Sequence, residues 1–399
     1  MITTQETTHY DIIVVGAGLV GSSVIVGLQK AGFRIAVLEH HLPNVMTNNQ
    51  QDSRPISLAY GSQQVLDHWG IWSALATAAC PIDTVHVSSQ GYFGRVKFSA
   101  DEYDLPALGY VVPFAQLQQA LYQKAASLEQ VSFISIEKLN QIECEHQAAS
   151  VSYRAADKDH KISADLLIAA DGAQSTCRQL LRIDTVSENL GEVAHIAAID
   201  LASPHQGIAY ERFTKKGTMA ILPLFDAKQC RLVWTMDKAQ SDEVSTWDSD
   251  TLLSALKNVF GERLGPILKI EKQASFPLQT TLAKTAIKER AVLLGNAAHT
   301  IYPLAAQGFN LGLQDAVVLA RVLSQAKDQK QSIGDAAVLQ RYVDLCAHRQ
   351  KRVIGFTNGI AKVFRWQWPL LGHCRAMGLL GVDLLPFLKN DFAKTLMHV

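Results

Sequence analysis

The residues with the clearest chemical meaning form a glycine cluster near the start of the chain. Gly16, Gly18 and Gly21 have the spacing G-x-G-x-x-G, and Glu39 follows about twenty residues later. The first glycine permits a tight turn, the second lets a pyrophosphate approach the backbone, and the third lets a helix pack closely. Free N–H groups at the N-terminus of that helix favour an anion, and Glu39 can accept hydrogen bonds from an adenosine ribose. The cluster predicts a dinucleotide site without distinguishing FAD from NAD.

A strand, a helix and a second strand must position this cluster. Residues 10–15 are a β-branched run, as expected for a strand buried on both faces of a parallel sheet. Residues 19–31 are mostly small and apolar and end before Gly32, which predicts a helix. Residues 34–38 form a second apolar run. This order predicts a βαβ unit, whereas the alternative for the glycines is a purely structural turn.

Two later segments repeat the pattern of an apolar strand that runs into a glycine turn. The runs are residues 164–170 and 291–294, and a helix is expected to open at residues 307–310. If the dinucleotide is FAD, its reduced flavin ring carries negative charge around N1 and the C2 oxygen. The N–H groups at such a helix start would stabilise this charge. The alternative for the glycines there is close helix packing. The candidate residues in these segments are Asp171, Gly172, Asn296, Pro303, Gly308, Phe309 and Asn310.

Together the three turns resemble the fingerprints of the class A flavoprotein monooxygenases, the para-hydroxybenzoate hydroxylase type. The resemblance implies FAD as cofactor, with NAD(P)H and molecular oxygen as co-substrates. It places Asp171 and Gly172 near the FAD and the passing NAD(P)H. It places Asn296 at the ribityl chain, where the family has an aspartate. Asparagine can make hydrogen bonds there but brings no negative charge.

A narrower resemblance is to the ubiquinone-pathway hydroxylases within this class. Residues 52–58 are similar to their D-x-R-x-x-x-L stretch, whose arginine, here Arg54, lies close to the flavin. Gln116 stands at an expected helix start, where relatives place an amide that meets the FAD. The alternatives are a solvated charge for Arg54 and an exposed helix residue for Gln116. The segments that resemble the branch acting on 2-polyprenyl-6-methoxyphenol are residues 85–88, 210–214 and 307–312.

The resemblance also implies the reaction. NAD(P)H reduces the flavin, oxygen adds at its C4a position, and the distal oxygen of the hydroperoxide is transferred to the aromatic ring. Because the cofactor supplies this chemistry, the protein needs no nucleophile of its own. His299 and Tyr302 are the nearest candidates for a base that draws a proton from a phenol, but a structural role is favoured for both. The catalytic residue is left unassigned.

The expected fold class is α/β, with a Rossmann-like FAD-binding domain assembled from distant segments, an inserted antiparallel-sheet substrate domain and a helical C-terminus. Residues 207–236 alternate apolar and polar positions around a turn at 215–217, which indicates the antiparallel sheet. The FAD-binding segments are expected at 1–80, 111–185 and 281–345, the substrate segments at 81–110 and 186–280, and the helical region at 346–399.

Composition limits which partners and which cellular compartment are expected. The chain has 399 residues, and its 37 basic and 37 acidic residues cancel, so nucleic acid is not an expected partner. Its six cysteines lack the spacing of a zinc site, and no metal is expected. The polar start does not resemble a signal peptide, and no apolar window is long enough to span a bilayer. We therefore expect a cytoplasmic protein, with peripheral contact to the inner membrane as an open alternative.

The expected partner is a polyprenyl phenol, and a multi-enzyme assembly of the ubiquinone pathway is a further expectation from the resemblance. An apolar set near the C-terminus predicts either an amphipathic membrane platform or, as we favour, a helix packed on the core. Three functions stay open: hydroxylation of this phenol, hydroxylation of another ubiquinone intermediate or a soluble aromatic, and a non-catalytic prenyl carrier. The apolar set consists of Trp366, Trp368, Leu370, Leu371, Leu379, Leu380, Leu384 and Leu385.

Overall fold

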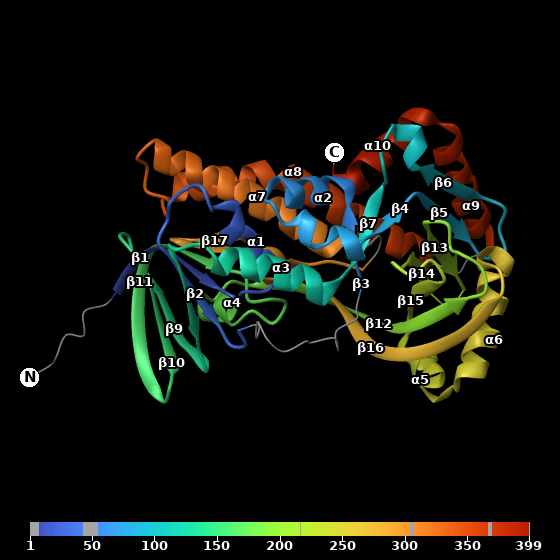
Figure 1. Cartoon of the computed structure of the whole chain (residues 1–399), viewed down its shortest axis with the longest axis horizontal. Helices are drawn as coiled ribbons and strands as arrows, with labels where there is room; N and C mark the ends of the chain where they lie inside the picture. Colours follow the sequence, from blue (N-terminus) through green and yellow to red (C-terminus); the bar gives the residue numbers. More distant parts are fainter. Residues whose placement is uncertain (1–7, 43–54, 216, 304–306, 366–368, 399) are drawn as a thin grey trace, which may run out of the picture.

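The computed structural model describes residues 8–42, 55–215, 217–303, 307–365 and 369–398. Two large sheets lie at opposite ends of an elongated molecule, and the long helices α7 (Gln307–Asp328) and α8 (Ala336–Arg365) run along one side (Figure 1). Of the helices that are described, none combines the length and apolar character needed to cross a bilayer. Arg54, Trp366 and Trp368 lie outside the described residues.

The first sheet is the parallel sheet that the sequence predicts. Its order is β17-β18-β11-β1-β2-β8, and β1 is hydrogen-bonded in parallel to both β11 and β2. Apart from β17, which pairs antiparallel to β18, the neighbours in this order are parallel. The strands are β1 (Thr8–Val15), β2 (Ile35–Glu39), β8 (Val131–Ser135), β11 (Lys158–Ala169), β17 (Ile287–Lys288) and β18 (Ala291–Leu293).

Both faces of this sheet are covered, which explains its unbroken apolar runs. Ile12 and Val14 of β1 pack toward the helices, whereas Ile13 and Val15 pack toward an antiparallel ribbon, and each is at most 5% exposed. Each such side chain contributes about 1.5–3 kcal/mol on burial. The covering helices are α1 (Leu19–Gly27), α3 (Phe114–Ala126), α7 (Gln307–Asp328) and α8 (Ala336–Arg365), and the ribbon contains β9 (Lys138–Cys144) and β10 (Ala149–Ala155).

Helix α1 is shorter than the sequence predicts. It ends at Gly27, not at Ala31, because its last turn tightens. The Leu28 N–H donates to the carbonyls of both Val24 and Ile25, and the Ala31 N–H donates to that of Leu28. Shared bonds of this kind are common where a helix ends.

The second sheet confirms the predicted antiparallel region. Its order is β19-β16-β12-β15-β14-β13-β5-β6, and β13, β14 and β15 pair antiparallel in sequence order. Helices α5 (Lys238–Thr246) and α6 (Ser249–Phe260) cover one of its faces. The strands are β5 (Thr84–Ser89), β6 (Arg95–Ser99), β12 (Thr185–Leu201), β13 (Ile208–Thr214), β14 (Gly217–Pro223), β15 (Gln229–Asp237), β16 (Ile267–Ala283) and β19 (His299–Thr300).

A small three-stranded sheet lies between the two large ones. It has the order β3-β7-β4, from β3 (Pro55–Ala59), β7 (Gly109–Pro113) and β4 (Cys80–Ile82). Helix α2 (Tyr60–His68) follows β3 directly. Near the C-terminus, α9 (Pro369–Leu384) and α10 (Pro386–Met397) lie beside the second sheet, next to β5 and β6 (Figure 1).

The strands of the two large sheets come from interleaved parts of the chain. Those of the first sheet lie within 8–39, 131–169 and 287–293, and those of the second within 84–99, 185–283 and 299–300. Both sheets are therefore assembled from distant segments. The exact domain boundaries given above stay predictions.

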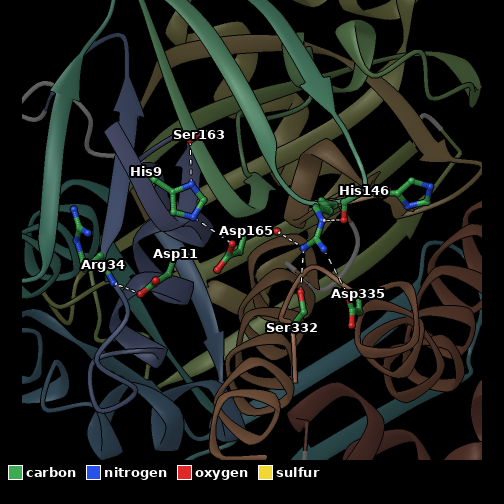
Figure 2. Close-up of polar contacts among 9 residues, drawn as sticks. His9, Asp11, Arg34, His146, Ser163, Asp165, Ser332 and Asp335 are labelled. Atoms are coloured by element: carbon green, nitrogen blue, oxygen red, sulfur yellow. Dashed lines mark hydrogen bonds and ion pairs between the residues drawn. The ribbon is translucent and has the colours of Figure 1, made fainter. Parts of the chain in front are cut away.

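One end of the first sheet carries polar contacts that have a structural role. The Arg290 guanidinium donates to the carbonyl oxygens of His146 and Asp165 and to Ser332 Oγ, which joins the sheet to the turn before α8 (Figure 2). His9 contacts both Ser163 Oγ and Asp165 Oδ1 there. Although this is a Ser-His-Asp set, its histidine and aspartate side chains are 51% and 42% exposed. It also lies at the start of β1, opposite the end that carries the glycine turn.

Candidate active site

The first two glycine turns are in direct contact. Gly16 has φ +98°, and a Cβ atom at Gly16 would lie 2.5 Å from the Ala170 carbonyl oxygen. A Cβ at Gly21 would lie 1.9 Å from the carbonyl oxygen of Gly16. Real Cβ atoms do not approach backbone oxygens this closely, so both positions require glycine. The end of β1 and the end of β11 thus form one joint turn.

The third turn reaches the same place through Val20. A Cβ at Gly295, which has φ +61°, would lie 3.0 Å from the Val20 side chain, and one at Gly312 would lie 2.9 Å from it. Val20 stands near the start of α1, Gly295 follows β18, and Gly312 lies in the first turns of α7. The three turns, far apart in the chain, therefore converge. For Gly312, therefore, the alternative role given in the sequence analysis, close packing of a helix, is the one that the structure shows.

Other glycines of these turns face open space, and two of them lie at helix starts. A Cβ at Gly18 or at Gly308 would meet no other atom of the described residues within 4 Å. Gly18 is the N-cap of α1 and has extended backbone, so the N–H groups of the first turn of α1 are directed toward this space. This arrangement fits a dinucleotide, because a pyrophosphate can approach the backbone at Gly18 and a ring system can approach it at Gly308.

The Glu39 carboxylate lies at the end of β2 beside the first turn. Its Oε2 accepts a hydrogen bond of 2.6 Å from the Ala17 N–H, and its Oε1 accepts one of 3.1 Å from the His41 N–H. Since a carboxylate can accept about four hydrogen bonds, capacity remains for ribose hydroxyls. Glu39 thus positions the turn and can also contact the cofactor.

In the second turn, Asp171 shapes the backbone. Its Oδ1 accepts from Ser175 Oγ at 2.6 Å, and its Oδ2 accepts from the Cys177 N–H at 2.9 Å, at the start of α4 (Thr176–Leu180). The next residue, Gly172, has φ +84°, a conformation that favours glycine. The carboxylate therefore holds the turn in a fixed shape beside the first one.

Arg178 is a residue of this region that the sequence did not single out. Its guanidinium is buried and donates to the Ala297 carbonyl at 2.8 Å and to the Ala173 carbonyl at 2.9 Å. It thereby joins the second turn to the third. An arginine in a short helix carries no signal for this role, because one of its partners lies 119 residues away.

In the third segment, one residue is hydrogen-bonded within the protein core and others face a cavity. Asn296 and Pro303 are exposed at the edge of a cavity. Asn310 is buried, and its side chain accepts from the Ala59 N–H and donates to the Ser57 carbonyl, both at 2.9 Å. Asn310 therefore fixes β3 against α7, while Gly308 and Phe309 line the cavity.

The start of α7 is also held by the C-terminal segment. Gln307 is buried, its Nε2 donates to the Leu396 carbonyl, and its Oε1 lies 2.7 Å from His398 Nε2. Burial, followed by the positive charge of Arg349, lowers the pKa of His398 to about 4. The ring is therefore neutral at pH 7, and α10 packs next to the start of α7.

Gln116 does not share these contacts. It is exposed in the first turn of α3 and is not among the residues that line the cavity, whereas Phe114, two positions earlier, is. The sequence pattern located the helix start correctly. The contact of Gln116 with the cofactor stays a prediction.

The two candidate bases are buried among protein partners. His299 Nε2 lies 2.8 Å from Asp315 Oδ2, and Gln350 donates to the same oxygen at 2.7 Å. The Tyr302 hydroxyl donates to Glu192 Oε2 at 2.8 Å. Burial, followed by the Glu192 charge, raises the pKa of Tyr302 well above its usual value. These contacts favour the structural role for both residues.

A cavity of about 950 Å³ extends from the third turn to the C-terminal helices. Its floor is the face of the second sheet that α5 and α6 leave uncovered. β3 and the start of α7 form one end, and α9 and α10 form the other. The residues that line these ends include Asn296, Pro303, Gly308 and Phe309 on the side of the third turn, and Leu379, Val382, Phe392 and Leu396 on the side of the C-terminal helices.

The cavity wall is overwhelmingly apolar. Of the described residues that line it, none is a lysine, an arginine or a histidine. Aliphatic and aromatic side chains from β5, β6, β12, β13, β14 and β15 cover the floor. Sequence reasoning found the antiparallel sheet but not this cavity, because the wall combines alternate residues of six strands with two helices from the C-terminus.

Comparisons with known proteins agree with this geometry. The family model described as FAD binding domain matches residues 9–357. The 3-demethoxyubiquinol 3-hydroxylase of Escherichia coli is 30% identical over 402 residues, covering 98% of this chain and 99% of that protein. The ubiquinone hydroxylase UbiL of Rhodospirillum rubrum is 26% identical, covering 97% of this chain and 89% of that protein.

Solved structures share the fold. The p-nitrophenol 4-monooxygenase of Pseudomonas putida has a TM-score of 0.79 at 16% identity, covering 98% of this chain and 99% of its own. Klebsiella pneumoniae HpxO complexed with FAD and uric acid has a TM-score of 0.74 at 20% identity, covering 98% and 97%. The predicted fold and FAD cofactor are confirmed, with NAD(P)H and oxygen as the co-substrates typical of the class. This chain belongs to the FAD-binding family of flavoprotein monooxygenases, together with the ubiquinone hydroxylases.

Proposed function

We propose that this enzyme hydroxylates the aromatic ring of a polyprenyl phenol, with 2-polyprenyl-6-methoxyphenol as the first candidate. The observation that carries the proposal is the apolar cavity of about 950 Å³ that leads from the third turn to α9 and α10. A ring next to Gly308 and Phe309 would lie at the flavin end. A hydrocarbon tail would then extend along the second sheet toward Leu379 and Phe392.

The cavity chemistry favours this substrate class over a soluble aromatic acid. A carboxylate bound in a low-dielectric site needs a cationic partner, since an unpaired buried charge is strongly unfavourable. The described residues of the wall include no such cation. Aliphatic side chains, in contrast, stabilise a prenyl tail by about 25 cal/mol per Å² of apolar surface removed from water.

Each part of the site contributes differently to this reaction. Bound FAD, once reduced by NAD(P)H, supplies the activated oxygen. The N–H groups at the start of α1 bind the pyrophosphate, and those at the start of α7 stabilise negative charge on the flavin ring. The apolar wall excludes water from the ring, which limits the loss of activated oxygen as hydrogen peroxide.

A second candidate is another intermediate of the same pathway. The E. coli relative at 30% identity is named for the hydroxylation of 3-demethoxyubiquinol, which also joins a ring to a prenyl tail. The same cavity suits both molecules, because they share the apolar tail. They differ in ring substituents, so product analysis separates them.

We also propose that the far side of α9 and α10 contacts the membrane from which the substrate comes. Met377, Leu384 and Phe387 are 72%, 66% and 67% exposed, while Leu379 and Phe392 of the same helices face the cavity. In this proposal both alternatives predicted for the segment apply, because one side of α9 and α10 packs on the core and the other is exposed. Assembly with other enzymes of the pathway stays a proposal from the resemblance.

The decisive experiment compares two phenols in a host that lacks the gene. Accumulation of 2-polyprenyl-6-methoxyphenol, with restoration of its hydroxylated product by purified enzyme, FAD, NAD(P)H and oxygen, supports the first candidate. Accumulation of 3-demethoxyubiquinol supports the second. Accumulation of neither, together with no turnover of either compound in vitro, overturns the proposed substrate class.

A further inference from the structure

The cavity reaches the protein surface at both of its ends. Of the described residues that line it, only Asn296, Pro303 and Gly378 are exposed, whereas the others are buried or half-buried. Asn296 and Pro303 belong to the third segment, at the end where the flavin is expected. Gly378 lies in α9, at the end of the molecule far from the first sheet (Figure 1). The wall is thus open to solvent at a second place, away from the flavin end.

Close packing does not explain the glycine at this second place. A Cβ atom at Gly378 would meet no other atom of the described residues within 4 Å. The close approach of α9 to the second sheet depends on Gly94 instead, where a Cβ atom would lie 2.0 Å from the Ala376 carbonyl oxygen. Glycine inside a helix costs about 0.5–1 kcal/mol relative to alanine. A side chain at position 378 would project into open space where the wall meets the surface.

The residues on both sides of this opening are apolar. Leu379 and Val382, next to Gly378 in α9, line the cavity. Met377 and Leu380 of the same helix are 72% and 38% exposed. A hydrocarbon chain that passes Gly378 would therefore leave apolar residues of the wall and meet apolar residues on the outer side of α9.

The size of the cavity makes an exit necessary for a long tail. Its volume of about 950 Å³ is at the upper end of the roughly 300–1,000 Å³ of pockets that bind small molecules. A phenol ring with a short prenyl tail is a ligand of this size. A tail of many prenyl units exceeds it, so the far end of such a tail must lie outside the wall.

We propose that the tail of the substrate leaves the cavity past Gly378, where the missing side chain keeps the wall open. This inference rests on the proposed function, because it requires a substrate with an apolar tail. A side chain at position 378 would occupy the opening and reduce the contact of a long tail with the wall. A short tail ends before the opening and would lose less. Gly378 is therefore a position that determines which tail lengths the enzyme accepts.

The test measures how affinity depends on tail length. The probes are 2-geranyl-6-methoxyphenol, with a short tail, and 2-solanesyl-6-methoxyphenol, with a long one, both in the same neutral detergent micelles. The readout is the dissociation constant from the change in flavin absorbance of the holoenzyme. Gly378→Leu should raise the ratio of the long-tail to the short-tail constant about tenfold, because a modest loss of buried apolar surface has this effect. Gly378→Ala should raise it less, and it decides if the leucine variant loses FAD.

A matched control lies three residues further along the same helix. A Cβ atom at Gly381 also meets no other described atom within 4 Å, but Gly381 is not among the described residues that line the cavity. Gly381→Leu should therefore leave the ratio unchanged. An unchanged ratio in the Gly378 variants overturns the inference, as does an equal rise in Gly381→Leu or wild-type enzyme that binds the short probe alone. Failure of the wild-type enzyme to bind either probe would instead overturn the proposed function, and this inference with it.

Discussion

The two ends of the active site are built on different principles. On the nucleotide side, the contacts come from backbone turns at the ends of parallel strands, and Gly16 and Gly21 leave no room for even one methyl group. On the substrate side, the wall comes from side chains on one face of an antiparallel sheet, and open volume remains between that face and α9 and α10. The first end recognises a fixed cofactor, whereas the second, on the proposed function, accommodates a long and flexible tail. Substitutions should therefore separate cofactor binding from substrate binding.

The largest effect is expected at Gly21. In Gly21→Ala the new Cβ would lie 1.9 Å from the Gly16 carbonyl oxygen, so the turn must shift and FAD binding should be lost. We expect a destabilisation of about 3 kcal/mol or more. Thermal unfolding and the FAD content of the purified protein measure both effects.

Gly18→Ala is the matched control for this prediction. Its Cβ meets no described atom within 4 Å, so the fold should survive while the affinity for FAD falls about tenfold. If Gly21→Ala kept the wild-type melting temperature and FAD content, the conclusion that the turns on the nucleotide side cannot accept a methyl group would be disproved.

The next effect concerns the joint between the second and third turns. Arg178→Met leaves the Ala173 and Ala297 carbonyls without their guanidinium donor. An unsatisfied buried acceptor costs about 1–3 kcal/mol, and the FAD content should fall with the free energy of unfolding. Denaturant titration measures this. Arg182→Met, an exposed arginine four positions later, should change stability by less than about 0.5 kcal/mol.

A bulky residue on the cavity floor should weaken substrate binding without changing cofactor binding. Ala220 lines the cavity opposite Glu211, so Ala220→Phe should raise KM for a prenylated phenol about tenfold by displacing part of its buried apolar surface. FAD content should not change. Ala227→Phe, in an exposed turn of the same sheet, is the control. A fall in FAD content equal to the loss of substrate affinity would show that the two ends are not separable.

The smallest effect is a pH dependence at the junction of the two ends. The pKa of His398 falls from its usual 6.5 to about 4 in the folded protein, mainly through burial. The unfolded chain therefore binds more protons between these values, so stability is complete above pH 6.5 and decreases as the pH falls toward 4. The partly exposed ring should account for roughly 1 kcal/mol of that decrease.

Denaturant titration from pH 7 to pH 4.5 tests this dependence. His398→Gln keeps a polar side chain next to Gln307 but cannot titrate in this range, so its stability should fall less than that of the wild-type protein. Parallel pH profiles of the two proteins would contradict the assignment to His398.

Much of the nucleotide side follows from the sequence alone. Gly16, Gly21 and Glu39 could be interpreted because each role is local, requiring a turn after a strand or an acid at the end of the next strand. The joint between the turns could not be predicted in this way. Arg178 acts through Ala297, and Asn310 holds β3 through Ser57 and Ala59, more than 100 and 250 residues away in the chain. Nothing in the neighbouring residues indicates such partners.

The sequence by itself predicted a dinucleotide cofactor and the strand, glycine turn and helix at the first motif, because these are patterns of short range. Only the tertiary structure decided the cavity, since its wall joins alternate residues of β5, β6 and β12 to β15 with α9 and α10. Alternation along a strand shows that one face is apolar, but not what covers that face. Whether it meets a helix or encloses a ligand depends on the packing of segments distant in the chain, and no local propensity encodes that choice.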